Sequence, residues 1–113
     1  MHSVENKLAE IRSGANAVER YEWHTIIEDC MEPTLIRGDM VVADKSQDHF
    51  TGPGFYLVRY PGDDGVFVCR LDCIHQGYFN IIFDNQRYRS ELRVPAEKFE
   101  IAGKVVVTAR AHS

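Results

Sequence analysis

The most informative stretch of the sequence is Glu28-Asp29-Cys30-Met31-Glu32-Pro33-Thr34-Leu35, followed by Gly38-Asp39 and Met40-Val41-Val42-Ala43-Asp44. Pro33 has no backbone N–H to donate, so residues 31–35 cannot continue a central β-strand. They are predicted to form a short turn or a single helical turn. Gly38-Asp39 predicts a second turn, and the apolar run after it predicts a strand over residues 40–44.

The chain from Tyr21 onward is dominated by patterns typical of β-strands. Residues 21–27 follow, for the most part, the period of two that a half-buried strand shows. Two turn sequences, residues 61–65 and 75–77, each separate two apolar runs and predict β-hairpins. The predicted strands cover residues 21–27, 40–44, 55–60, 66–71, 78–83 and 101–109. At least six short strands at this spacing predict a mostly-β fold, either a sandwich or a curled barrel.

Residues 3–12, SVENKLAEIR, differ from the rest of the chain because their pattern is helical. Ser3 can cap a helix there. Three apolar residues fall on one stripe of that helix: Val4, Leu8 and Ile11. A helix this short is not stable in isolation, and residues 13–16 predict a break after it. The sequence therefore predicts an N-terminal arm or linker over residues 1–20 and a β domain over residues 21–113.

Length and composition exclude several classes of protein. The 113 residues fit a single domain that buries roughly two-thirds of its unfolded surface, so neither a metal nor a disulfide is needed for folding. The net charge of −4 disfavours direct nucleic-acid binding, which needs clustered Lys and Arg. No apolar run approaches the roughly 18 residues of a membrane span, and no signal-peptide pattern is present. With an odd number of cysteines (Cys30, Cys69 and Cys73), these features predict a cytoplasmic protein with reduced thiols.

Five segments, in order, resemble the C-terminal domain of the LexA/phage CI repressor family, a peptidase S24-like family of self-cleaving Ser-Lys proteins. The nucleophile segment of that family reads Ser-Met-Glu-Pro-Thr-Leu with a trailing Gly-Asp, and residues 30–35 with Gly38-Asp39 are similar to it. The other landmarks are residues 54–58, residues 66–71, residues 82–85 with Tyr88, and residues 101–106. The resemblance implies a curled β-sheet of short strands, like those of LexA and signal peptidases, with a short N-terminal helix or arm.

The resemblance fails at the positions that carry the family's chemistry. Cys30, between Asp29 and Met31, stands where the family has its nucleophilic serine, and Cys69 stands where the family has its lysine general base. A Ser-Lys dyad works because a desolvated lysine loses its proton and can accept one from the hydroxyl. No amine is available at position 69. His24, six residues before Cys30, would lie about 20 Å away from it on a straight strand.

The cleavage site of the family is missing as well. Self-cleaving relatives cut an Ala-Gly or Cys-Gly bond upstream of the nucleophile, whereas the one glycine before Cys30 is Gly14, which follows Ser13. The sequence therefore predicts that the fold is retained and hydrolysis is lost, with Cys30 and Cys69 as vestigial dyad positions. It predicts no catalytic residue, no cofactor and no metal ligand.

The remaining role that the resemblance implies is oligomerisation. In the repressor family this domain joins chains that carry helix-turn-helix modules, so we expect operator DNA to be bound only through an N-terminal domain that these residues do not contain. The final apolar run fits either a central strand or a dimer edge, and the resemblance favours the edge. The candidate dimer-strand residues are Ile101, Val105, Val106 and Val107. Without self-cleavage, induction would need another route, such as a protein antirepressor that docks on this domain.

Three alternatives remain open. The first is a cysteine-nucleophile peptidase of the S24 type, in which an activated Cys30 thiol still cleaves the chain or a partner. The second is a relative of the signal peptidases, disfavoured because the sequence shows neither a lysine base nor a membrane anchor. The third concerns Cys30 and Cys69, which the resemblance places side by side, and which are either inert buried thiols or a redox-active pair.

Other chemistry-bearing groups favour structural interpretations. Cys69 and Cys73 would lie about 13 Å apart on one strand face, too far to share a zinc ion with His75. The turn at residues 31–35 is expected to pack against the sheet rather than to form a substrate rim. The aromatic residues are expected in the core, because few basic residues lie among them. A small basic cluster is expected on a solvated loop: Arg87, Arg89 and Arg93.

Overall fold

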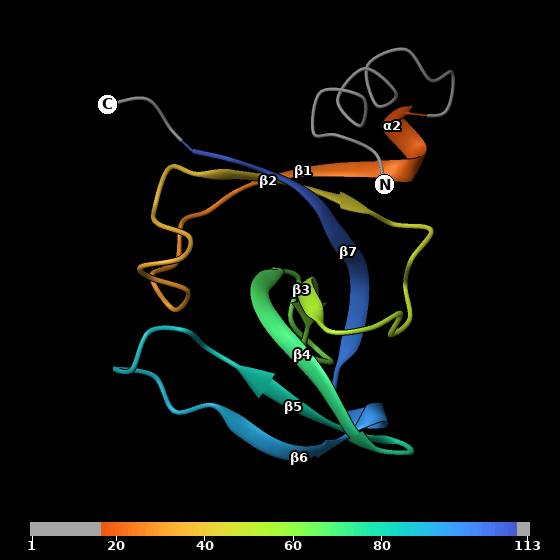
Figure 1. Cartoon of the computed structure of the whole chain (residues 1–113). Coiled ribbons are helices and arrows are strands. Elements are labelled where there is room, and N and C mark those ends of the chain that lie inside the picture. Colours follow the sequence, from red (N-terminus) through yellow and green to blue (C-terminus); the bar gives the residue numbers. More distant parts are fainter. Residues whose placement is uncertain (1–16, 111–113) are drawn as a thin grey trace.

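The computed structural model describes residues 17–110, and one antiparallel sheet of seven strands dominates them (Figure 1). A four-residue helix, α2 (Ala17–Arg20), leads directly into the first strand. The strands are β1 (Tyr21–Thr25), β2 (Met40–Asp44), β3 (Gly54–Arg59), β4 (Phe67–His75), β5 (Tyr78–Ile82), β6 (Glu91–Pro95) and β7 (Glu100–Ala109). A 3-10 turn, η1 (Ala96–Lys98), connects β6 to β7. The predicted mostly-β fold is confirmed.

The strands follow one another across the sheet in the order β1-β2-β7-β3-β4-β5-β6. Figure 1 shows how the sheet curls: β1, β2 and one end of β7 lie at the top, β5 and β6 at the bottom, and β3 and β4 between them. Both predicted hairpins are present, because β3 pairs with β4 and β4 pairs with β5, antiparallel in each case. Gly77, with a φ of 81°, provides the left-handed backbone that the second hairpin turn needs.

Strand β6 is the element that the sequence patterns do not predict. Its residues, Glu-Leu-Arg-Val-Pro, do not alternate cleanly and end in proline, and Arg93 in its middle has a φ of 56°. A non-glycine residue in the left-handed region interrupts a regular strand, and the pairing with β5 changes register nearby. β6 forms one edge of the sheet, where such an irregularity disturbs the pairing of only one neighbour.

The central strands β3 and β4 are buried on both faces. On one face, Leu57 and Val68 pack with apolar side chains of β2 and of residues 26–35. On the other face, four residues that alternate with these two pack against Ile81 of β5 and Phe99, just before β7: Tyr56, Val58, Cys69 and Leu71. Successive side chains of a strand point to opposite faces, so a curled sheet can cover both sides of its middle strands. The core is therefore divided into two clusters by β3 and β4.

Strand β7 joins the two halves of the sheet. Residues 100–104 pair with β3, and residues 104–109 pair with β2. Gly103 lies at the crossover, where an added Cβ atom would come within 3.1 Å of the Asp44 carbonyl oxygen. The missing side chain lets β2 and β7 approach each other there. Beyond Lys104, the side of β7 that faces away from β2 has no paired strand among the described residues.

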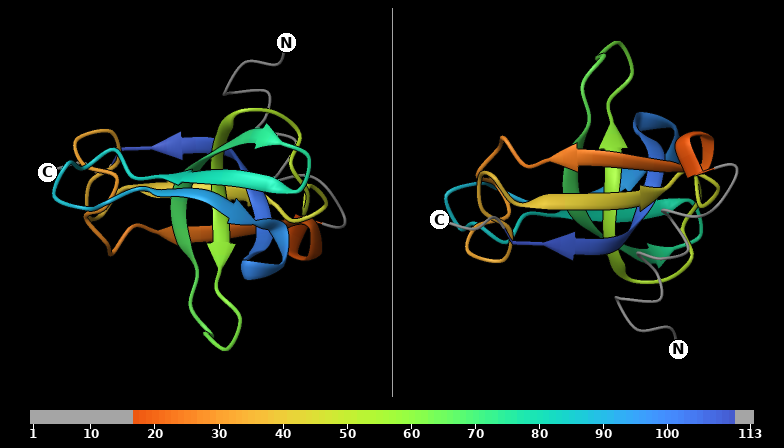
Figure 2. Two further views of the ribbon diagram at one scale, coloured as in Figure 1. Left: turned by 90° about the horizontal axis from the view of Figure 1, so that it is seen from below. Right: turned by 90° about the horizontal axis from the view of Figure 1, so that it is seen from above.

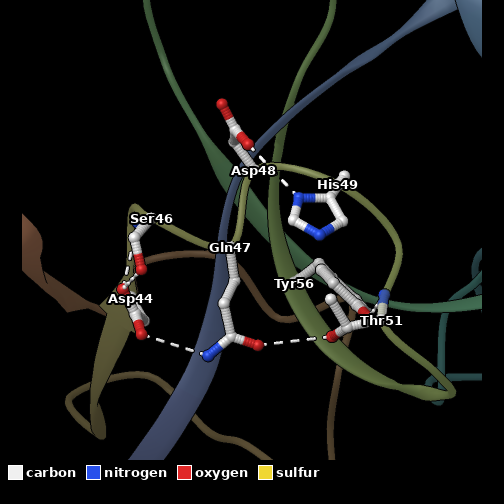
Figure 3. A network of polar contacts seen from close by, with 7 residues as sticks. All are labelled: Asp44, Ser46, Gln47, Asp48, His49, Thr51 and Tyr56. Carbon is white, nitrogen blue, oxygen red and sulfur yellow. Dashed lines mark hydrogen bonds and ion pairs between the residues drawn. The ribbon is translucent and has the colours of Figure 1, made fainter.

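Asp44, at the end of β2, is a buried carboxylate that ties α2 to the loop after β2. Arg20 donates to it from Nε at 3.3 Å and from Nη2 at 3.1 Å. The Ser46 amide and hydroxyl donate at 3.0 and 2.6 Å, and Gln47 Nε2 donates at 3.1 Å. Figure 3 shows Gln47 bridging from Asp44 to Thr51. Burial alone would raise the pKa of Asp44, but these bonds more than offset that effect and hold its pKa well below the ordinary value.

Candidate functional site

The segment that resembles the family's nucleophile forms a compact turn between β1 and β2. The Leu35 amide donates to the Met31 carbonyl oxygen at 2.9 Å, and the Glu32 amide donates to the Asp29 carbonyl oxygen at 3.1 Å. Met31 and Leu35 are buried and pack against β3 and β4. The predicted turn is confirmed, and its burial agrees with the interpretation of a packed turn that supports the sheet.

The loop after β5 closes over this turn. Its Asn85 donates from the backbone amide to the Cys30 carbonyl oxygen at 3.0 Å and from the side-chain amide to the Asp29 carbonyl oxygen at 2.9 Å. The Tyr88 hydroxyl donates to the Asp29 carboxylate. Asn85 and Tyr88 belong to one of the landmarks of the resemblance. In this structure they clamp the backbone on which Cys30 sits.

Asp84 links the same loop to β4 and to the turn. Its carboxylate accepts hydrogen bonds from Arg70 Nε at 2.7 Å, from Arg70 Nη2 at 3.0 Å and from the Thr34 hydroxyl at 2.5 Å. Burial alone would raise the pKa of Asp84, but these bonds outweigh it and keep the pKa below its ordinary value. Arg70 also lies over the Phe55 ring, 4.5 Å from the ring centroid. The turn, the loop and β4 therefore form one connected polar frame around Cys30.

Cys30 is buried, and its surroundings favour the protonated thiol. Its side chain is 7% exposed, and the thiol donates to the Val68 carbonyl oxygen at 3.8 Å. Burial raises the pKa of the thiol to about 11, and the Glu28 and Asp29 carboxylates act in the same direction. A cysteine activated as a nucleophile has a lowered pKa and positively charged neighbours. The surroundings of Cys30 are the opposite in both respects.

Cys69 directly follows Val68, whose carbonyl oxygen accepts the Cys30 thiol. The Cys69 side chain, however, lies on the other face of β4. Val68 packs in the cluster that contains Cys30, whereas Cys69 packs with Leu71 and Ile81 in the other cluster. Cys69 is fully buried; burial raises its pKa, and the charge of an ionised Cys30 would raise it further. Cys30, Cys69 and Cys73 are all free thiols. Cys30 and Cys69 thus lie on opposite faces of β4 and do not face each other, whereas the resemblance implies that they lie side by side.

His24 lies closer to Cys30 than the straight-strand prediction allows, and that prediction is wrong. β1 ends at Thr25, and the chain then turns so that His24 Nε2 lies 3.5 Å from Glu28 Oε1. The same Glu28 oxygen accepts the Val68 amide at 3.3 Å, and the carbonyl of that residue accepts the Cys30 thiol. His24 therefore approaches the site by way of Glu28, although its buried Nε2 has no hydrogen-bond partner among the described residues.

The charged groups around Cys30 disfavour removal of its proton. Within residues 17–110, the charged groups that act on the thiol, Glu28 and Asp29, are both acidic. Lys104, for comparison, donates to the Thr51 hydroxyl at 2.9 Å. Within the same part of the chain, no three His, Cys, Asp or Glu side chains are placed to hold a metal ion. Among the described residues, the groups around Cys30 favour the protonated thiol over the thiolate.

The candidate dimer-strand residues lie in three different environments. Ile101 packs against the cluster that contains Cys69, and Val105 packs against the cluster that contains Cys30. Val107 is buried, with Val106 beside it, in a small third cluster. The sequence left open whether this strand is central or at an edge, and each description fits part of β7. Its middle pairs with both β2 and β3, whereas each half has one side without a paired strand among the described residues.

Comparison with known families agrees with this geometry. The model of the peptidase S24-like family matches residues 3–106, which include the Cys30 turn, the loop over it and most of β7. Comparison with individual curated proteins finds no match. Across the part of the chain that the structure describes, no helix has the length and apolar character needed to cross a membrane. The family match extends over most of the sequence and confirms the resemblance. The chain belongs to the peptidase S24-like family.

Proposed function

We propose that this domain is a non-cleaving member of its family that serves as the C-terminal oligomerisation and regulatory domain of a phage-type, CI/LexA-like transcriptional repressor. The state of Cys30 carries the proposal: the thiol is buried, hydrogen-bonded to a carbonyl oxygen and flanked by carboxylates. A thiol whose pKa is about 11 is almost entirely protonated at neutral pH. Cys69 adds a second buried thiol where the family has its amine, so neither half of the proton relay is present.

The open side of β7 supports self-association. Residues 105–109 pair with β2 on one side, and their other side presents unpaired backbone groups of a strand with three consecutive valines. A second copy that adds to this side in antiparallel fashion would continue the sheet and satisfy those groups. Two-fold symmetry would bring the same residues of both chains together. We therefore propose a homodimer through this half of β7.

Dimerisation gives the domain its effect on DNA. When two DNA-binding modules are joined through their oligomerisation domains, the second binds its half-site intramolecularly, and affinity rises by roughly 10²–10⁴. The acidic domain itself need not touch the operator, in agreement with its net charge of −4. Because cleavage would be absent, a regulator would act by docking on the domain and separating the chains, as a protein antirepressor would.

A gain-of-affinity experiment tests the proposal. The chain is fused behind a monomeric helix-turn-helix module, and binding to one half-site and to paired half-sites is measured together with sedimentation equilibrium. The fusion should dimerise and prefer paired half-sites. Val106→Lys should remove both properties, because it places like charges opposite each other in a symmetric edge. Leu92→Lys is the matched control: it introduces the same charge at an apolar residue, 68% exposed, on β6 at the far edge of the sheet.

Two outcomes would count against the proposal. A fusion that remains monomeric at high concentration would exclude the oligomerisation role. Equal loss of dimer in both lysine variants would move the interface away from β7. Thr108→Lys, at an exposed position of the same half-strand, replaces Val106→Lys if that variant does not fold.

The competing function, a cysteine-nucleophile peptidase, makes a different prediction. Such an enzyme would yield a fragment whose formation depends on Cys30 and increases as the thiolate forms. Incubation at pH 9–10, compared with a Cys30→Ala variant, would reveal it by mass spectrometry. We expect no Cys30-dependent fragment, because desolvation and Glu28 keep the thiol protonated over most of this range.

A further inference from the structure

The first residues of β7 have an unpaired side that the proposed dimer does not use. Glu100, Ile101 and Gly103 pair with β3 on one side, whereas the pairing of β7 with β2 begins only at Lys104. On the side away from β3, residues 100–102 therefore have no paired strand among the described residues. An unpaired strand edge is a template on which another extended chain can add.

A cavity of about 350 Å³ opens beside this edge, and its floor is aromatic. The Phe79 ring makes edge-on contacts with the rings of Phe50 and Phe99, with centroids 5.5 Å apart in each pair. These rings and Ile101 pack in the core cluster that contains Cys69, so the core holds the floor in place. Ligand pockets occupy roughly 300–1,000 Å³. At the lower end of that range, this apolar cavity suits one large apolar side chain.

A second cavity, of about 300 Å³, lies between residues 100–102 and the loop that follows β2. Three carboxylates and two basic side chains line it: Glu22, Asp48, Glu100, Lys45 and Arg59. Asp48, Glu100 and Ile101 line both cavities, so the two form one continuous groove along the open edge of β7. We call it the β7 groove.

The rim of the apolar cavity is acidic. Asp48 and Glu100 lie there, and no lysine or arginine lines this cavity within the part of the chain that the structure describes. Arg59 donates to Glu100 at 3.2 Å from the other cavity. Figure 3 shows Asp48 beside His49 on the loop. Complementary charges guide a partner to its site and fix its register. A basic side chain next to an apolar one would match this rim.

The β7 groove lies at the opposite end of the molecule from the Cys30 turn. Both views of Figure 2 show the loop after β2 and the start of β7 at one end, and the turn before β2 and the last residues of β7 at the other. A segment bound in the groove would therefore leave the proposed dimer edge at residues 105–109 uncovered.

We propose that the β7 groove binds an extended segment of a partner protein that carries an aromatic or leucine side chain next to a basic one. The segment adds to the edge of β7 as a strand, and its backbone bonds to residues 100–102. Successive side chains of a strand point to opposite faces. The apolar side chain thus enters the apolar cavity while its basic neighbour lies against Asp48 and Glu100. This proposal does not require the repressor function.

Peptide binding to the ¹⁵N-labelled chain, followed by NMR, tests the proposal. The peptide is acetyl-Thr-Lys-Phe-Lys-Thr-amide. One control peptide has serine in place of phenylalanine, and the other has glutamate in place of both lysines. The first peptide should shift the amide resonances of residues 100–102 and protect amides on their open side from hydrogen exchange. Both controls should bind at least about 10-fold more weakly, because one lacks the apolar anchor and the other brings like charges together.

Two pairs of variants locate the site on the protein. Ala96→Trp, at an exposed position that lines the apolar cavity, should fill the cavity and abolish binding. Lys98→Trp adds the same ring in the same 3-10 turn, lines neither cavity and should leave binding intact. Asp48→Asn should weaken binding about 2–5-fold, as expected for one exposed ion pair. Asp64→Asn, in the exposed turn between β3 and β4, should have no effect.

Three results would overturn the proposal. The first is equal affinity for the three peptides, and the second is the same affinity in Ala96→Trp and Lys98→Trp. The third is a set of resonances at residues 100–102 that move with protein concentration but not with peptide, which would identify a second copy as the occupant. The dimer variant Val106→Lys should still bind the peptide, so failure of the proposed self-association and failure of this proposal are distinguishable.

Discussion

The sharpest prediction concerns the rate at which Cys30 reacts with an alkylating reagent. Burial and two carboxylates raise the pKa of this thiol from 9.0 to about 11. At pH 8 its thiolate fraction is then on the order of 10⁻³, against about 10⁻¹ for the unshifted thiol. A more basic thiolate is intrinsically more reactive by roughly 8-fold for this difference, given a Brønsted coefficient near 0.45. Alkylation should therefore be about 10-fold slower from ionisation alone, and the 7% exposure slows it further.

The assay follows iodoacetamide modification of each cysteine-containing peptide by mass spectrometry between pH 7 and pH 10. Cys73, which is exposed, serves as the internal reference in the same molecule. The logarithm of the Cys30 rate should rise with unit slope through pH 10, without a plateau. Glu28→Gln should speed the reaction of Cys30, because it removes a negative charge that opposes the thiolate and keeps an acceptor for the Val68 amide. Glu32→Gln, in the same turn, is the charge-matched control.

A plateau in the Cys30 rate below pH 9 would refute this reasoning. It would mean that a group stabilises the thiolate in solution, and it would return the cysteine-nucleophile peptidase to first place. A Glu28→Gln variant that reacts more slowly than the parent would refute the assignment of Glu28 as an opposing charge, whatever the shape of the pH profile.

Three further predictions concern stability and redox behaviour. Asp44→Ala should lower the free energy of unfolding at pH 7 by about 2–4 kcal/mol, measured by urea denaturation. Because the folded-state pKa of Asp44 lies below its ordinary value, this contribution is complete above about pH 4 and is lost as the pH falls, so the parent and the variant should converge in acid. Gly103→Ala should cost about 1–3 kcal/mol, since its Cβ would lie 3.1 Å from a carbonyl oxygen. Gly65→Ala, where nothing lies within 4 Å, should cost clearly less. Mild oxidation should leave Cys30 and Cys69 titratable as free thiols after denaturation, because they face opposite sides of β4; loss of one pair of thiols would contradict that geometry.

Local chemistry explains which parts of the fold could be read from the sequence. Pro33 lacks a donor, and the turn around it forms as expected. The strand at residues 40–44 and the two hairpins follow from apolar runs bounded by turn residues. β6 could not be found in this way, because its residues do not alternate between apolar and polar and Arg93 interrupts it with a left-handed backbone conformation. It is recognised as a strand by its pairing with β5.

The polar frame of the site depends on contacts between distant residues, which sequence patterns do not encode. Arg70 meets Asp84 across two strands, and Asn85 reaches the Cys30 backbone from 55 positions further along the chain. The resemblance drew attention to Asn85 without revealing what it binds. The predicted distance of about 20 Å between His24 and Cys30 is wrong because it assumes one straight strand through both residues. β1 ends at Thr25, and the chain then turns so that Glu28 lies beside the His24 imidazole.

The crossover at Gly103 has a consequence for biosynthesis. Met40 pairs with Ala109, so β2 acquires its second neighbour only after nearly 70 further residues have been made. Pairings this distant in sequence slow the search for the native state and leave strand edges uncovered during it. While β7 is still in the ribosomal exit tunnel, the β1–β2 hairpin and the β3–β4–β5 meander cannot join into one sheet, because β7 lies between them. The edges of both remain unpaired. Once β7 emerges, it pairs with both β2 and β3 and completes the sheet. Nascent chains stalled before β7 should therefore be the form that chaperones and proteases recognise.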